Sequence, residues 1–480
     1  MKIIILFQFL FISAITFPQI TFQKTYGGIE AEDANAVVQT DDGGYIIAGS
    51  TRSYGAGNFD LYIIRTDPSG NIIWTKTFGG DRYDKSQDII KTGIGEYLIA
   101  AFKSTLTDAE IYLLKINDSG DTLWTKTIGT VDNDHVTKIK NTSDGGFVLC
   151  GYIERYFEYK YCLIKFNSDG DSLWAKSYDF GWANSIEQTS DGGYVLIVYP
   201  YDNLNPIQDF QLVKTDQFGD TLWTRFYGGS DVEVAYAGEQ TTDGGYIMAG
   251  RTDSYGNGAS DFYLVKTNSN GDFLWDKTYG GDLDDRAFTA METSDGGFII
   301  GGYTASFNVG YFDFYMVRTN STGDTLWTRT YGGEWQEEIY DIEETSDGGF
   351  AAVGYTHSFG AGSDPNIYFI KTDGNGLISH VEDQNNGNEI HFELYQNYPN
   401  PFNPSTIIQY AISNRQFVSL KVYDFLGNEV ATLVKEEKPS GRYEVEFNTS
   451  NIKHQLSSGV YFCRLQTENY SKTIKMLYLK

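Results

Sequence analysis

The chain has 480 residues, of which 21% are charged, 41% hydrophobic and 16% aromatic. This balance excludes a disordered chain, which would be less apolar, and a bundle of membrane helices, which would be more apolar beyond the first twenty residues. With 64 Asp and Glu against 36 Lys and Arg, the formal net charge is −28. We therefore expect no nucleic-acid partner, because a phosphate backbone would be repelled over a long range.

The first segment is typical of a secretory signal peptide, which we place at residues 1–18. Lys2 supplies the positive charge, and the apolar run from Ile3 to Ile15 is too short to span a bilayer comfortably. We expect cleavage between Ala14 and Gln19 and no transmembrane segment in the mature chain. An uncleaved anchor is the alternative interpretation.

A repeat of about 51 residues dominates the next part of the chain, and repeats of this length are typical of β-propellers. Tryptophans recur at spacings of 49 to 52 residues, at Trp74, Trp124, Trp174, Trp223, Trp275 and Trp327. An Asp-Gly-Gly-aromatic marker begins at Asp42, Asp144, Asp191, Asp243, Asp295 and Asp347, with a degenerate copy at residues 94–97. Each unit holds four short strand-like runs separated by turn sequences. The pattern predicts an all-β fold, a seven-bladed β-propeller of four-stranded blades over residues 19–380.

The last unit lacks its fourth strand, since His380 stands where a tryptophan is expected. Residues 22–28, Phe-Gln-Lys-Thr-Tyr-Gly-Gly, resemble the tryptophan strand of the other units. We therefore predict that this N-terminal segment pairs with residues 367–372 and closes the ring, because an unpaired sheet edge would otherwise remain.

Three columns of the repeat keep a fixed charge sign and are interpreted structurally. Basic residues end the third strand of every unit and recur in the fourth, and acidic residues open the third strand in five units, at Asp60, Glu110, Asp209, Asp261 and Asp313. We expect cross-strand ion pairs between these neighbouring outer strands. The tryptophan column is expected to pack between blades.

A further column is acidic in six of seven units and lies at Glu32, Asp84, Asp134, Glu233, Asp285 and Glu337, with Gly181 as the exception. In propeller geometry this position lies near the central axis, so we expect these carboxylates to converge around one channel mouth. Such a ring could bind Ca²⁺, another hard cation or an amine-bearing partner. The alternative is that they are ordinary acidic loop residues of an acidic protein.

The long loops between the second and third strands should lie on the same face as this column. They carry aromatic residues at Tyr54, Tyr255, Phe307 and Phe359. Aromatic rings beside carboxylates are typical of sugar-binding surfaces, although Tyr-Gly pairs are also ordinary loop chemistry. The hypothesis is that this face binds an extracellular glycan or protein.

An enzyme of the same fold is the alternative function. The turn at residues 168–174 resembles the Asp-box of sialidases, but Gly170 precedes Trp174 by four positions instead of three. No unit adds an arginine cluster with a tyrosine and an acid, and no histidine lies in a nucleophile or zinc motif. We predict a non-catalytic binding module, with a sialidase-like glycoside-processing enzyme as the alternative.

After a polar linker at residues 381–391 the composition changes. The motif residues are Asn397, Pro399, Asn400, Pro401, Phe402, Asn403 and Pro404, followed by Val-Tyr-Asp at residues 422–424 and a basic last strand. Residues 392–480 resemble the type A sorting domain of the type IX secretion system of Bacteroidota. The resemblance implies an Ig-like β-sandwich, the secretion machinery as partner, and a location outside the cell or on the outer membrane. The ring resembles secreted bacterial seven-bladed repeat proteins.

The cysteine count excludes a disulfide framework, because only Cys150, Cys162 and Cys463 are present. Cys150 and Cys162 fall on adjacent predicted strands. A single bridge and two buried thiols are both compatible with that placement.

Overall fold

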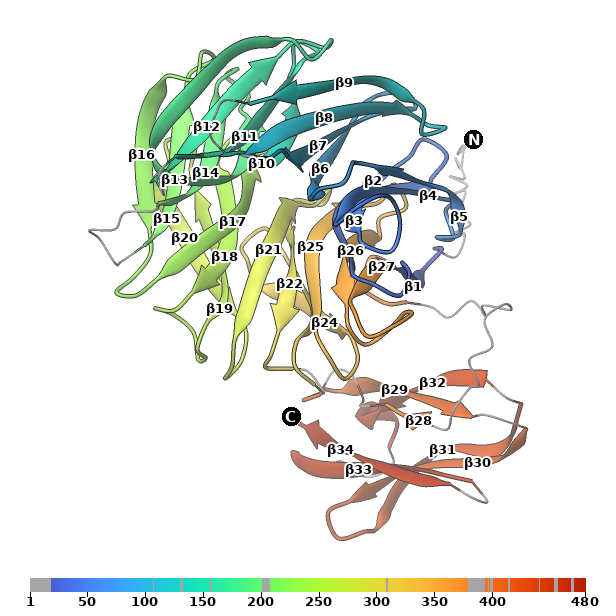
Figure 1. The fold of residues 1–480 in the computed structure, drawn as a ribbon. Helices are drawn as coiled ribbons and strands as arrows, with labels where there is room; N and C mark the ends of the chain where they lie inside the picture. Colours follow the sequence, from blue (N-terminus) through green and yellow to red (C-terminus); the bar gives the residue numbers. More distant parts are fainter. Residues whose placement is uncertain are drawn as a thin grey trace, which may run out of the picture. The chain divides into compact units, whose positions relative to one another are not determined.

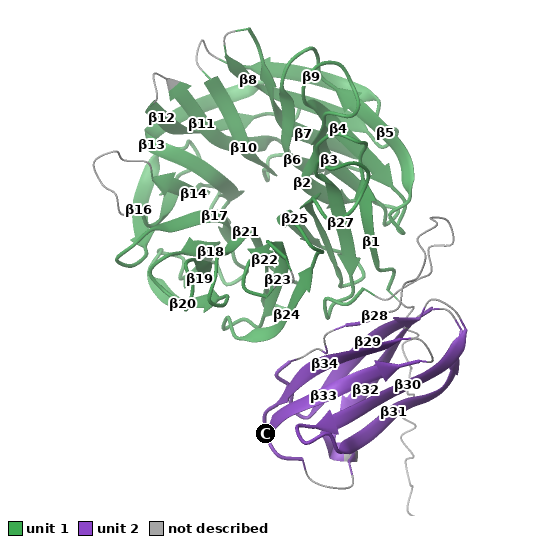
Figure 2. Ribbon diagram, turned by 60° about the horizontal axis from the view of Figure 1, so that its bottom comes forward, with its two compact units in different colours: residues 1–379 green, residues 380–480 purple. Residues whose placement is uncertain are grey.

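A computed structural model describes residues 19–106, 108–129, 133–155, 158–200, 208–307, 310–378, 393–395, 397, 400–412, 415–439, 441–452, 456–467 and 470–480. The predicted signal peptide and linker lie outside these residues. The chain divides into two compact units, residues 1–379 and 380–480, which Figure 2 colours separately. Among the described residues, no helix is long and apolar enough to cross a membrane.

The first unit consists of antiparallel sheets that follow one another around a common centre (Figures 1 and 2). The first two sheets contain β2 (Glu32–Gln39), β3 (Tyr45–Thr51), β4 (Asp60–Thr66) and β5 (Ile72–Phe78), then β6 (Asp84–Gly93), β7 (Glu96–Ser104), β8 (Ala109–Asn117) and β9 (Thr122–Ile128). The next is a seven-stranded sheet of β10 (Asn133–Asn141), β11 (Phe147–Arg155), β12 (Glu158–Phe166), β13 (Ser172–Gln188), β14 (Tyr194–Pro200), β15 (Phe210–Thr215) and β16 (Thr221–Tyr227).

Three further four-stranded sheets complete the unit. They contain β17 (Glu233–Gln240), β18 (Tyr246–Thr252), β19 (Asp261–Thr267) and β20 (Phe273–Tyr279); β21 (Asp285–Glu292), β22 (Phe298–Thr304), β23 (Asp313–Thr319) and β24 (Thr325–Tyr331); and β25 (Glu337–Glu344), β26 (Phe350–Thr356) and β27 (Asn366–Thr372) with β1 (Phe22–Tyr26). Repeated four-stranded sheets around one centre make this unit a β-propeller.

The predicted closure is confirmed. β1 pairs antiparallel with β27, from Phe22 opposite Lys371 to Tyr26 opposite Ile367. Phe22 takes the place of the tryptophan of the other sheets: its ring lies 4.9 Å from Phe369 and 6.2 Å from Tyr45 of the first sheet. The first and last parts of the propeller sequence therefore share one core, and the ring has no open edge at this point.

The tryptophan column packs between sheets as predicted. Trp223 lies 5.9 Å from Tyr246 of the next sheet in an edge-to-face arrangement. Its indole covers Gly271, which has φ of +76° in the turn between β19 and β20. A side chain at this glycine would be strained and would lie within 3 Å of the indole, so turn and tryptophan require each other.

The basic columns form ion pairs, but not with the partners predicted. The buried third-strand residue Lys266 pairs with Asp243 of the Asp-Gly-Gly turn in its own sheet (2.9 Å). Lys277 of the fourth strand pairs with Asp324 of the next sheet (3.0 Å). The prediction of pairs between the two outer strands of one sheet is wrong, because both cations reach the turns at the strand ends.

The second unit contains a three-stranded sheet of β28 (Glu393–Leu394), β29 (Ser405–Ile412) and β32 (Gly441–Asn448). A four-stranded sheet contains β31 (Glu429–Lys438), β30 (Gln416–Asp424), β33 (Gly459–Gln466) and β34 (Ser471–Tyr478), and a short 3₁₀ turn spans Thr449–Asn451. Residues of both sheets, among them Ile408 and Val422, share one buried apolar core.

Candidate functional site on the ring axis and the loop face

The acidic column does not form an open ring of carboxylates. Glu233 is fully buried at the start of β17, where its Oε2 accepts the Gly229 N–H (2.8 Å) and its Oε1 accepts the Thr252 hydroxyl (2.7 Å) and the Ser254 N–H (3.2 Å). Each donor belongs to its own sheet or to the connection that leads into it. The carboxylate therefore joins the Gly-Gly turn to the loop between β18 and β19.

The other members of the column are placed in the same way. Glu32 and Glu337 repeat all three hydrogen bonds, and Asp84, Asp134 and Asp285 are at most 4% exposed. Within the described part of the chain, no group of three or more His, Cys, Asp or Glu is placed to hold a metal ion. The expected open ring of carboxylates is thus corrected: the glutamates at these positions are buried and are held by backbone and hydroxyl donors of their own sheets.

The four predicted loop aromatics lie against their own sheets. Tyr255 is 42% exposed, its ring lies 5.5 Å from Tyr263, and its hydroxyl donates to the Gly228 carbonyl (2.9 Å). Tyr54 makes the same contacts with Tyr62 and Gly27. Phe307 is 49% exposed over Tyr315, and Phe359 is half-buried over Tyr368. These rings hold the loops in place and leave part of their surface on the loop face, where ligand binding stays a prediction.

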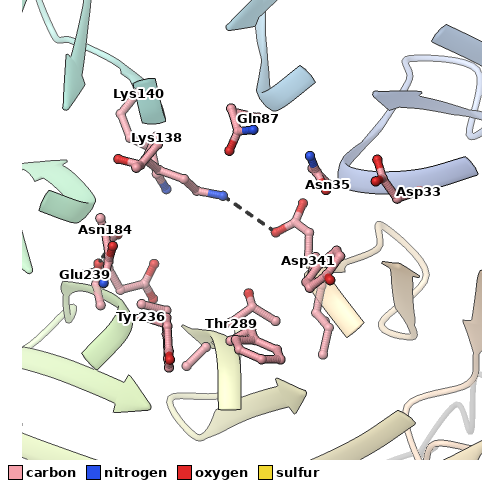
Figure 3. Close-up of a pocket in the computed structure, with 18 of the residues that line it drawn as sticks. Asp33, Asn35, Gln87, Lys138, Lys140, Asn184, Tyr236, Glu239, Thr289 and Asp341 are labelled. Carbon is pink, nitrogen blue, oxygen red and sulfur yellow. Dashed lines mark hydrogen bonds and ion pairs between the residues drawn. The ribbon is translucent and has the colours of Figure 1, made fainter. Parts of the chain in front are cut away.

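The ring axis contains a cavity of about 430 Å³ that the sequence analysis did not assign. It is lined by the innermost strands β2, β6, β10, β13, β17, β21 and β25. Figure 3 shows ten of the lining residues, from all seven of these strands, labelled around this space. Ligand sites in proteins are concave and combine apolar walls with a few placed polar groups, which makes this cavity a candidate site.

A β-bulge in each innermost strand positions one residue beside the axis. The register shifts around Asn35, Gln87, Thr137, Asn184, Tyr236, Phe288 and Tyr340, and all seven residues line the cavity. A bulge adds one residue to a strand and redirects its side chain, and bulges are frequent at functional sites. The bulge repeats in every sheet, whereas the residue that it presents does not.

The bulge residues divide the cavity into a polar side and an aromatic side. Asn35 and Asn184 donate to backbone carbonyls of the next innermost strand, at Ser86 (2.5 Å) and Ala235 (2.8 Å), and Thr137 does the same. On the other side, the ring of Phe288 lies 5.1 Å from Tyr236 and 5.8 Å from Tyr340. Amides on one wall and aromatic rings on the other suit a ligand with both hydroxyl groups and an apolar face.

Charges in the cavity are paired. Lys138 lies 3.1 Å from Asp88 and 3.9 Å from Asp341, the pair marked in Figure 3. Burial opposes the charge of Lys138, but the two carboxylates outweigh it and raise its pKa. Asp88 also accepts the Ile139 N–H (2.9 Å) and Asp341 the Val37 N–H (3.0 Å), so these acids satisfy donors at the inner edge of the neighbouring sheet.

One carboxyl in the cavity titrates near neutral pH. Burial raises the pKa of Glu239 to about 7, against the opposing effect of Lys140. Glu239 accepts the backbone N–H of Glu292 from the next innermost strand. Lys140 itself lies 3.2 Å from Glu187. A small change in surroundings could therefore shift the charge of Glu239.

The sorting motif is built into the second unit. Phe402 is 2% exposed and lies 5.2 Å from Tyr478, while its N–H donates to the Leu477 carbonyl (2.9 Å). Asn400 accepts the Leu477 N–H (2.6 Å), and the buried Asn397 donates to Thr406 (2.9 Å). Pro399 lies outside the described residues. Asn400 and Phe402, near the start of the second unit's sequence, therefore pack against β34, the last strand of that unit.

Residues 396–479 match the family described as "Secretion system C-terminal sorting domain". A type IX sorting domain is present. It indicates secretion of this protein to the cell surface or to the outside, and interaction with the type IX secretion machinery. No curated protein matched the sequence.

Solved structures similar to the chain include hydrazine synthase of Kuenenia stuttgartiensis, at 10% identity and a TM-score of 0.47 over 66% of this chain and 92% of that one. Sqt1 from Chaetomium thermophilum has 10% identity and a TM-score of 0.43 over 69% and 83%. The β-propeller domain of the trilobed protease from Pyrococcus furiosus has 8% identity and a TM-score of 0.41 over 76% and 100%.

Proposed function

We propose that this protein is an exported, non-catalytic binding module whose ligand is a glycan or a protein segment. In this proposal the ring has seven blades, because β13 ends one blade and begins the next: its first half pairs with β12 and its second half with β14. The second unit is an Ig-like sandwich that serves as the secretion address, and residues 1–18 are the signal peptide.

The observation that supports binding is the row of variable bulge residues around the axis. A structural requirement shared by all blades would favour one residue type, as it does in the tryptophan column. Instead, Asn, Gln, Thr and Asn occupy four consecutive blades, and Tyr, Phe and Tyr occupy the other three. A pyranose has apolar C–H faces and equatorial hydroxyls, which fit aromatic and amide walls respectively.

The test uses the full secreted chain on a glycan array, followed by titration of the best-binding oligosaccharide. Tyr236→Asn and Tyr340→Asn place in two aromatic blades the residue that β2 and β13 carry at the same bulge, so the fold should tolerate them. We expect the double variant to lower affinity about tenfold, since each ring contributes roughly 0.5–1.5 kcal/mol.

Phe273→Thr serves as the matched control, because this exposed ring lies on the outer strand β20 where other repeats carry threonine. Equal binding by the wild type and the cavity variant, with normal melting temperatures, would exclude the axis as the site. Absence of any bound glycan would leave a protein segment as the ligand, to be sought by cross-linking at the same residues.

A glycoside-processing enzyme is the second candidate, and the pKa of Glu239 favours it. A carboxyl that titrates near pH 7 in a cavity is typical of general acids. Release of reducing sugar from bound glycans, abolished by Glu239→Gln, would support the enzyme. Binding without turnover would support the module.

A further inference from the structure

Two large aromatic side chains lie exposed and stacked on the face that carries the loops between second and third strands, and neither of them lines the axial cavity. Tyr311 precedes β23, and Trp335 precedes β25 in the next sheet. Their rings are 5.8 Å apart and 9° from parallel, and the side chains are 58% and 53% exposed. Contiguous exposed aromatic surface is typical of sites that bind a ligand or a partner.

The fold does not require this aromatic pair. The backbones beneath it are joined because the Glu337 N–H donates to the Phe312 carbonyl (2.8 Å), and Phe312 bridges to Gln336. The junction between the preceding pair of sheets has the same backbone contacts, and there the Asp285 N–H donates to the Ser260 carbonyl (2.8 Å).

At that preceding junction, however, the equivalent side chains are Ala259 and Leu283. The same two positions at the β2–β6 junction hold Asn58 and Arg82. Aliphatic or polar side chains therefore suffice to build the junction, and the backbone contacts alone do not account for an aromatic pair at these positions.

The exposed apolar surface around the pair is small. Phe307 lies four residues before Tyr311 in the same loop, and the Leu283 N–H donates to Ser306 in that loop (3.0 Å). The side chains of Leu283, Phe307, Tyr311 and Trp335 are each about half exposed. Half of roughly 150–250 Å² for each large side chain gives roughly 400 Å² in all, against about 800 Å² per partner in a standard protein interface.

The negative charge around the aromatic pair further restricts the class of ligand. Exposed Glu334 adjoins Trp335, exposed Asp282 adjoins Leu283, and the chain carries a net charge of −28. Anionic glycans and nucleic acids would be repelled, while a neutral sugar would not be. Parallel, offset rings leave flat surface for the C–H face of a pyranose.

We infer that Tyr311 and Trp335 form a stacking platform for a neutral saccharide chain. This platform is a second site, and its test does not depend on what the axial cavity binds.

The test uses the full secreted chain and four neutral probes, cellohexaose, maltohexaose, xylohexaose and mannohexaose, titrated by calorimetry. The double variant Tyr311→Ala/Trp335→Leu carries the residues of the preceding junction. We expect the wild type to bind at least one probe and the variant to bind it about tenfold more weakly. A conservative variant, Tyr311→Phe/Trp335→Phe, should keep most of the affinity and covers the case in which the first variant fails to fold.

Phe226→Thr is the matched control, because Phe226 is 57% exposed on β16 where other repeats carry threonine, and it should bind like the wild type. The proposal is overturned if none of the four probes binds the wild type, or if the double variant binds as tightly as the wild type. It is also overturned if the aromatic pair proves necessary for a protein complex while no probe binds.

Discussion

The strand that closes the ring allows a direct test of how the propeller is held together. At each internal junction a tryptophan covers the turn of the next sheet, whereas at the closing junction Phe22 does so from β1. We predict that Phe22→Ala opens the ring locally without unfolding the internal sheets.

The size of the effect follows from the burial of this ring. Phe22 is 8% exposed, lies 4.9 Å from Phe369, and covers Gly70 of the first sheet. Truncation of a buried phenylalanine to alanine costs about 3–5 kcal/mol. Because β1 has only five paired residues, the remaining contacts, chiefly those of Tyr26, should not keep the strand paired after this loss of stability.

Hydrogen–deuterium exchange measures the opening strand by strand. A cost of about 3 kcal/mol corresponds to roughly a hundredfold faster exchange, since each 1.4 kcal/mol is a factor of ten. We expect this acceleration in the amides of β1 and β27 and little change in β12. Trp124→Ala is the control, because it weakens an internal junction whose strands stay covalently consecutive. Unchanged exchange in β27 would refute the reasoning that Phe22 closes the ring.

Three further predictions follow from buried polar groups. Glu233→Gln should lower the free energy of unfolding by about 1–3 kcal/mol in urea titrations, because an amide N–H₂ would face a backbone donor; no loss of stability would contradict the hydrogen bonds described. Because hydrogen-bond donors already occupy the buried carboxylates of this column, addition of Ca²⁺ or EDTA should leave the melting temperature unchanged. Burial raises the pKa of Glu239 from 4.5 to about 7, so its ionisation destabilises the fold progressively above pH 4.5 and by about 3 kcal/mol above pH 7. Glu239→Gln should therefore raise the melting temperature at pH 8.5 and leave it unchanged at pH 4.5, and a gain of equal size at both pH values would exclude this cause.

The repeated columns made the propeller predictable from the sequence. Trp223 and Gly271 recur because every junction needs the same contact, and the copy at Phe22 identified the closing strand. The same reasoning misassigned Glu233. A carboxylate that recurs in six units suggested a shared ligand, but a recurring residue in a repeat fold is more often one that every unit needs for its own loop.

The cavity was missed for the complementary reason. Asn35, Thr137 and Tyr236 are unlike one another, so they form no visible column. They also lie at bulges, and a bulge breaks the period-two alternation from which the facing side is deduced. A signal was present nonetheless: a position that varies in residue type at a fixed place in an otherwise regular unit.

Register also settled the question that the cysteine spacing left open. β11 and β12 are adjacent as predicted, but Gly151 is opposite Cys162, and Cys150 is opposite Leu163. Residues opposite each other point to the same face of a sheet, so Cys150 and Cys162 point to opposite faces and are both buried free thiols. A repeat predicts which strands are adjacent. The face to which a side chain points depends on the exact pairing register, because a shift of one residue reverses that face.

The division between fixed and variable positions also connects the two proposed sites. The fixed columns build each blade and bind it to the next, which leaves little freedom for function at Glu233 or Trp223. The axial bulges and the exposed junction positions are held by equally regular backbone contacts, yet their side chains differ from blade to blade. A rigid ring that presents variable side chains at fixed points is suited to recognition, because the backbone pays no ordering cost when the ligand binds. For that reason Tyr236 and Trp335, which differ from their counterparts in most other blades, are the residues whose replacement should change binding most while changing stability least.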